Sequence, residues 1–208
     1  MYNLLRKDFI ALKSSLWIII LYFVVFSAAF IPKSEMSIYF VGIYTAFGSK
    51  ILGTMIDIKN NNHNFLVTLP ISRKHIVKAK YIAAIMYALF GILASYGIHW
   101  LVKLEYPELN KPAFSGLDIM ASIGMVLVLT SIYMPLFYAL SKKGAAIINA
   151  VFMLALIILA QPAAFYLNMM SEKGVFEGQT LLLIPIGILL LFIASYYLTI
   201  FLFNRKDL

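Results

Sequence analysis

The sequence predicts an all-α integral membrane protein with six transmembrane helices. Three observations support this prediction: the composition, six long apolar stretches and the distribution of Lys and Arg. Hydrophobic residues make up 62% of the 208 residues and charged residues 12%, whereas globular proteins have about 45–50% and about 25%. A soluble domain of this length has too little interior to hide so much apolar surface. Lipid is therefore the expected surrounding of most of the chain.

A helix needs roughly 20 apolar residues to cross the hydrocarbon core of a bilayer. Six stretches are close to this length or exceed it: 14–31, 38–56, 76–102, 117–140, 145–169 and 180–203. Most of the connectors between them are short and polar, which leaves no room for a soluble domain. We therefore predict one transmembrane domain over residues 1–208.

Lys and Arg gather at one set of predicted helix ends. Thirteen of the 17 basic residues lie there and four lie at the opposite ends. Because basic residues favour the cytoplasmic side, both termini are predicted to be cytoplasmic in a multi-pass protein of the cell membrane. Topology also accounts for the formal net charge of +8, so no nucleic-acid partner is expected.

An alternative for residues 1–31 is a cleaved signal peptide, since a basic start and an apolar stretch precede Ser27-Ala28-Ala29. The apolar stretch is long for a signal. Its removal would leave five spans with the termini on opposite sides, so the six-span interpretation is preferred.

Residues 1–13 are predicted to form an amphipathic helix in the membrane interface. Apolar side chains recur there at helical spacing, at Tyr2, Leu5, Phe9 and Leu12. Basic residues between them can face headgroups or water, as in other interfacial helices. The alternative is that these basic residues only flank the first span.

Residues 57–75 form the one long connector, between the second and third spans. Its polar, asparagine-rich start is followed by Phe65 and Leu69, which share a helix face because they are four residues apart. Pro70 ends that short helix, and Ser72 can cap the helix that follows. An exposed apolar helix in so long a loop indicates docking to a partner; the alternative is a helix resting on lipid.

The stretch Leu69-Pro70-Ile71-Ser72-Arg73, followed by Ile76-Val77 and Lys80, resembles the loop between spans two and three of type-two ABC exporter permeases (type V fold). The resemblance covers nearly the whole chain, because the amphipathic start and six spans match as well. It implies that residues 64–69 are a cytoplasmic coupling helix that fits a cleft on an ATPase subunit. The implied docking residues are Asn64, Phe65, Leu66, Leu69 and Arg73.

The chain contains no G-x-x-x-x-G-K-[ST] phosphate loop, so it is not expected to be an enzyme or to hold a cofactor. ATP and Mg would be bound by a separate ABC ATPase subunit. The resemblance implies a second permease beside this one, either an identical copy or a paralogue, with membrane lipid around both. Cysteine is absent and the histidines have no metal-binding spacing, so no metal site is expected.

Three polar residues lie in or near the fifth span: Asn149, Gln161 and Asn168. They serve either hydrogen bonding between helices or the lining of a path, and packing is the preferred interpretation. Gln161-Pro162 is predicted to break or kink the outer part of this span.

Two further polar residues fall within predicted spans. Lys50 lies near the cytoplasmic end of the second span, where its ammonium is predicted to snorkel towards water. His99 lies near the outer end of the third span and is expected to be an interfacial hydrogen-bonding residue rather than a metal ligand.

These features predict a permease that exports an amphipathic or hydrophobic substrate, such as a membrane-active peptide or a drug-like molecule. The scarcity of buried charge disfavours a small ion as the substrate. The alternative is a stand-alone membrane protein, either an immunity factor or a secondary transporter that does not use ATP.

Overall fold

The structure is a computed structural model of the chain. It describes residues 4, 6–7, 10, 13, 16–32, 37–60, 71–106, 116–172 and 180–205. At positions 38, 117, 142, 159–172 and 180–182 it describes the backbone only.

The described residues form six helices and no strand: α2 (Leu16–Phe30), α3 (Ser37–Lys59), α5 (Arg73–Glu105), α6 (Gly116–Ala139), α7 (Lys142–Glu172) and α8 (Thr180–Asn204). Each helix coincides with one apolar stretch of the sequence. The all-α prediction is therefore confirmed for the part of the chain that the structure covers. Three helices within this part, α5, α6 and α8, are long and apolar enough to cross a membrane.

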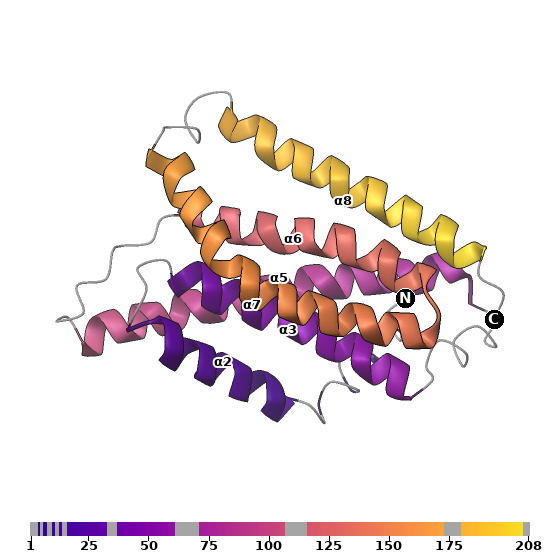
Figure 1. The fold of residues 1–208 in the computed structure, drawn as a ribbon, viewed down its shortest axis with the longest axis horizontal. Helices are drawn as coiled ribbons and strands as arrows, with labels where there is room; N and C mark the ends of the chain where they lie inside the picture. The colour runs from indigo at the N-terminus through magenta and orange to yellow at the C-terminus, as the bar shows by residue number, and fades with distance from the viewer. Residues whose placement is uncertain are drawn as a thin grey trace.

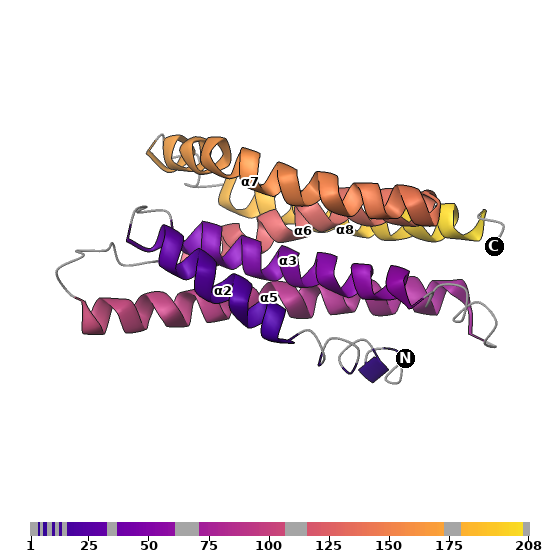
Figure 2. The same ribbon diagram turned by 60° about the horizontal axis from the view of Figure 1, so that its bottom comes forward.

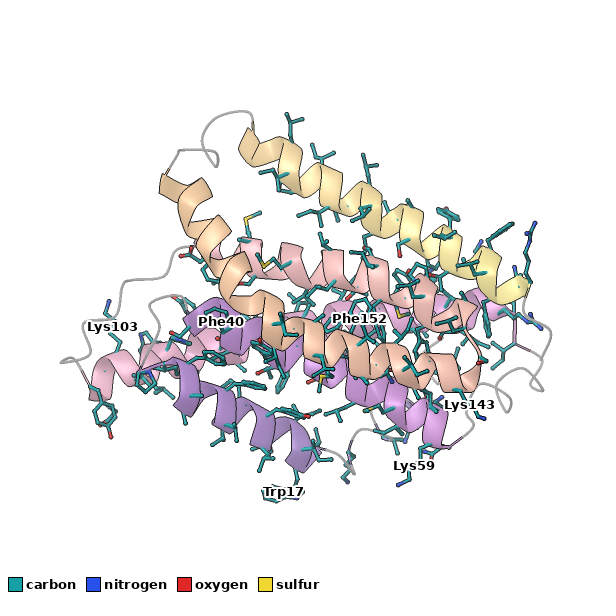
Figure 3. All side chains as sticks on the ribbon, viewed as in Figure 1. Trp17, Phe40, Lys59, Lys103, Lys143 and Phe152 are labelled. Carbon is teal, nitrogen blue, oxygen red and sulfur yellow. The ribbon has the colours of Figure 1, made fainter. Side chains whose placement is uncertain are left out.

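Consecutive helices run in opposite directions along the long axis of the bundle (Figures 1 and 2). The most extensive contacts join α3 to α5 and α6 to α8, and α2 packs on α3. We call the end at which α3 finishes and α5 starts the connector end. Figure 3 shows Lys59 and Lys143 at this end and Lys103 at the other, in agreement with the separation of charges in the sequence.

The centre of the bundle is aromatic. Phe47 of α3 lies edge-on to Tyr133 of α6 with their ring centroids 5.5 Å apart, and Phe152 of α7 lies 5.2 Å from Tyr133. Large apolar side chains also point outward, such as Phe90, which is 58% exposed, and Leu190, which is 63% exposed. An apolar outer surface around a packed aromatic interior is what lipid requires of a helix bundle.

The helix α7 stays helical from Lys142 to Glu172, so Gln161-Pro162 does not break it. Its ribbon does turn away from its initial direction towards the C-terminal end (Figure 1). A proline within a helix removes a backbone hydrogen bond and bends the helix. Pro135 and Pro185 lie inside α6 and α8.

Candidate functional site at the connector end

The predicted docking residues fall mostly outside the described residues. Asn64, Phe65, Leu66 and Leu69 belong to residues 61–70, of which the structure describes nothing. Their assignment to an ATPase contact remains a prediction. What the structure describes is the pair of helix ends that hold the connector: the last turns of α3 and the first turns of α5.

A buried ion pair joins these two helix ends. Asp57 of α3 accepts a hydrogen bond from the ammonium of Lys80 of α5. Asp57 is 3% exposed and Lys80 8% exposed. A second ammonium, that of Lys7, lies 3.7 Å from the other carboxylate oxygen of Asp57. Opposite charges attract each other strongly away from water, and either charge would be costly to bury without its partner. The contacts of Asp57 with Lys80 and Lys7 therefore hold α3, α5 and the N-terminal segment together beside the connector.

The ammonium of Lys50 joins the same two helices. It donates a hydrogen bond to the backbone carbonyl of Lys80 over 3.1 Å, and Lys50 is 3% exposed. The prediction that this side chain snorkels towards water is therefore wrong. Its helix face turns the ammonium inward, where a carbonyl of α5 replaces water as the acceptor.

The N-terminal segment is partly described. Leu4, Arg6, Lys7, Ile10 and Lys13 have a helical backbone. Leu4 is buried in the core, whereas Ile10 is 59% exposed. The predicted apolar stripe of Tyr2, Leu5, Phe9 and Leu12 lies outside the described residues, so the interfacial helix remains a prediction.

The start of α5 agrees with the capping prediction in position but not in its hydrogen bond. Ser72 occupies the N-cap position with an extended backbone, and the backbone N–H of His75 donates to its carbonyl over 2.9 Å. The hydroxyl of Ser72 pairs with the ring Nδ1 of His75 at 2.5 Å rather than with a backbone N–H. Ser72 thus marks the first turn of α5 as the sequence predicts, but with a different hydrogen bond.

Arg73, the first residue of α5, reaches the last turn of α8. Its guanidinium donates to the carbonyls of Phe203 and Asn204 over 2.7 and 3.1 Å. It also lies 5.4 Å from the ring centroid of Phe203. Arg73 therefore has a structural contact within the chain, and its predicted contact with an ATPase is not tested by this geometry.

Two turns further along α5, a polar cluster links three helices. The hydroxyl of Tyr81 lies 2.7 Å from that of Ser195 and 2.8 Å from that of Thr199, both in α8. Ser195 in turn donates to the backbone carbonyl of Ser131 in α6 over 2.6 Å. Hydrogen bonds between helices in an apolar setting fix their relative rotation. This cluster ties the start of α5 to α6 and α8.

Of the polar residues predicted in the fifth span, the structure describes the side chain of Asn149. It is fully buried, and its Oδ1 accepts a hydrogen bond from Tyr133 over 2.6 Å. Tyr133 also shares a hydrogen bond with Thr54 of α3. Asn149 therefore makes the bond between helices that packing requires. Gln161 and Asn168 lie in α7, but their side chains are outside the described part.

At the opposite end of the bundle, His99 is 4% exposed and bonded on both ring nitrogens. Nδ1 lies 2.6 Å from the carbonyl of Ser95, which can only accept, so Nδ1 carries the proton. Nε2 lies 2.7 Å from the hydroxyl of Ser37 in α3. The predicted hydrogen-bonding role is confirmed, although the side chain is buried rather than interfacial.

Sequence reasoning missed the ion pair of Asp57 and Lys80 and the cluster around Tyr81. A signal for the ion pair exists, since an acid and a base face each other across the connector at the ends of two neighbouring spans. Ionisable residues at membrane depth are usually paired. Nothing in the sequence marks Tyr81, because serine, threonine and tyrosine are common in spans.

His, Asp and Glu side chains form no group of three that could hold a metal ion within the described ranges. A family model described as "ABC-2 family transporter protein" matches residues 3–204. No curated protein and no solved structure matches the chain.

Proposed function

The chain belongs to the ABC-2 family of transporter proteins, and on this premise we propose that it is the permease subunit of an ATP-driven exporter. The family supplies the membrane component of ABC transporters, which is not itself catalytic, and it implies an ATPase partner. The match over residues 3–204 is the observation that carries the proposal. The proposal has residues 64–69 dock on the ATPase, which binds ATP and Mg.

The proposed topology has six spans within one domain and both termini in the cytoplasm. Support comes from the six helices on the six apolar stretches and from the opposite positions of Lys59 and Lys103 in the bundle (Figure 3). The connector end is then cytoplasmic, as the positive-inside rule favours. Residues 1–13 lie in the interface on the same side of the cell membrane.

The proposed substrate is amphipathic or hydrophobic, and a membrane-active peptide is its most specific form. The apolar outer surface of the bundle, where side chains such as Phe90 and Leu190 are exposed, supports an apolar path. The buried charges of the described helices, those of Lys50, Asp57 and Lys80, lie towards the connector end. A second permease, identical or a paralogue, completes the path, with Gln161 and Asn168 as the polar lining that this chain contributes.

If residues 64–69 dock on the ATPase, Phe65→Asp combined with Leu69→Asp is expected to lower co-purification of the ATPase by at least about tenfold. The reason is that buried apolar anchors carry most of the binding energy of an interface. The tagged chain is expressed with its ATPase, extracted in detergent and quantified for bound ATPase. Asn61→Asp with Asn62→Asp is the control, since it adds the same charge to the polar part of the connector. Equal ATPase recovery from all three proteins would show that the assignment is wrong.

The stand-alone alternative is distinguished by transport. If the purified chain alone moves a fluorescent amphipathic peptide across liposomes under an ion gradient, and no ATPase co-purifies with it, the exporter proposal fails. The exporter proposal expects peptide movement to need both the ATPase and ATP.

A further inference from the structure

Arg73 donates hydrogen bonds to backbone carbonyls at the C-terminal end of α8. The last four carbonyls of a helix have no partner within the helix, and they carry partial negative charge. Arg73 supplies two N–H donors to the carbonyls of Phe203 and Asn204. Its planar, permanently charged guanidinium suits this geometry better than a lysine ammonium would. Arg73, which follows the connector at the start of α5, thus caps the C-terminal end of α8.

The end of α8 is itself firmly seated. Phe203 is 1% exposed, and its ring meets that of Tyr138 in α6 with centroids 4.9 Å apart. An arginine stacked against so buried a ring gains a cation–π contact in addition to its hydrogen bonds. The Arg73 contact therefore reaches the packed core rather than a frayed terminus.

A second attachment lies further along the same pair of helices. Tyr81 follows Arg73 by roughly two helical turns, about 12 Å along the axis, and bonds Ser195 and Thr199 of α8. Two attachments spaced along antiparallel helices prevent both sliding and rotation of one against the other. The adjacent Lys80 points to α3 instead, through Asp57.

We infer that Arg73 is a positioning residue that makes the first turns of α5 and the last turns of α8 one rigid unit. Displacement of the connector is then delivered directly to α8, the helix furthest from it in sequence. This inference rests on the proposed function for the origin of the displacement. It also separates Arg73 from the docking residues: its guanidinium works within the chain and not at the ATPase.

The test uses the absence of cysteine from the native chain. Lys74→Cys and Asn204→Cys place two thiols on exposed residues beside the Arg73 contact, and the carbonyl of residue 204 is kept. A short bis-maleimide is expected to crosslink the pair equally well without nucleotide and with a non-hydrolysable ATP analogue, in the complex with the ATPase. Adding Arg73→Gln is expected to lower the crosslinking yield about fivefold, because charge-assisted hydrogen bonds are among the stronger contacts.

A second measurement follows α8 itself. An environment-sensitive fluorophore on Asn204→Cys is expected to change its emission when the ATP analogue binds the complex. Arg73→Gln should reduce that change about fivefold while leaving ATPase co-purification unchanged, and Arg73→Lys should recover part of it. Lys78→Gln is the matched control: it removes an exposed cation from the same stretch of α5 and should behave as the native chain.

Each contrary result overturns the inference. It is wrong if Arg73→Gln leaves crosslinking and fluorescence unchanged, if the ATP analogue abolishes crosslinking in the native background, or if Arg73→Gln lowers ATPase recovery in step with fluorescence, which is the behaviour of a docking residue. If no ATPase associates with the native chain, the proposed function fails. The crosslinking yield with and without Arg73→Gln still decides whether the two helix ends are held together.

Discussion

Gly91→Ala is expected to lower the unfolding temperature of the detergent-extracted protein by roughly 5–10 °C, because overpacking a helix crossing costs up to about 3 kcal/mol. A Cβ at Gly91 of α5 would lie 2.5 Å from the backbone nitrogen and 2.7 Å from the Cα of Ala46 in α3. These are backbone atoms, so no side-chain rotation relieves the contact. Thermal unfolding followed by intrinsic fluorescence or by loss of monodisperse protein measures the effect.

Gly97→Ala is the matched control on the same helix. A Cβ at Gly97 meets nothing within 4 Å, and alanine is the better helix former by roughly 1 kcal/mol, so this variant should be as stable as the native chain or slightly more so. Ala46→Gly is not expected to rescue Gly91→Ala, since it removes only the Cβ of Ala46. Equal unfolding temperatures for Gly91→Ala and Gly97→Ala would contradict the close crossing of α3 and α5.

The positions of the helices were predictable because lipid imposes a length on each apolar stretch. The stretch 180–203 became α8 (Thr180–Asn204), and 38–56 became α3 (Ser37–Lys59). Pro70 and Ser72 likewise indicated a helix start, and α5 begins at Arg73. Each of these predictions uses local chemistry alone: apolar length, a missing backbone donor or a residue type that favours the N-cap position.

The rotation of each helix about its axis was not predictable. In a soluble bundle the polar face marks the outside, but lipid and core are both apolar here, so the sequence shows no dominant stripe. Lys50 illustrates the consequence: snorkelling was the reasonable expectation, yet α3 turns it towards the carbonyl of Lys80. The contact of Arg73 with Phe203 joins residues 130 apart in sequence, which no local pattern indicates.

The charged pair of Asp57 and Lys80 was partly predictable, unlike the helix positions, which were predictable, and the helix rotations, which were not. Its residues stand at the ends of two predicted spans on either side of the connector, so pairing could be suspected from sequence. Its burial could not, because burial depends on how closely α3 and α5 approach. That approach is set by small residues such as Ala46 and Gly91. The tight crossing and the buried ion pair are therefore coupled features of the same pair of helices.

Asp57→Leu is expected to lower the free energy of unfolding by about 3–5 kcal/mol, because it leaves the ammonium of Lys80 buried without its carboxylate. Lys80→Met should cost less, since Lys7 remains 3.7 Å from the carboxylate of Asp57. The backbone carbonyl that accepts from Lys50 survives both substitutions. Reversible unfolding in mixed micelles, or the unfolding temperature where refolding fails, provides the comparison.

The double variant Asp57→Leu with Lys80→Met decides whether burial or pairing sets the cost. Apolar residues that replace both charges of a buried pair often restore stability, so the double variant should be more stable than Asp57→Leu alone, with a coupling energy of about 2 kcal/mol or more. Lys78→Met controls for loss of a cation from α5, because Lys78 is exposed, and its effect should stay within about 0.5 kcal/mol. Additive single effects would mean that Asp57 and Lys80 stabilise the connector end separately, through other contacts, and not as a pair.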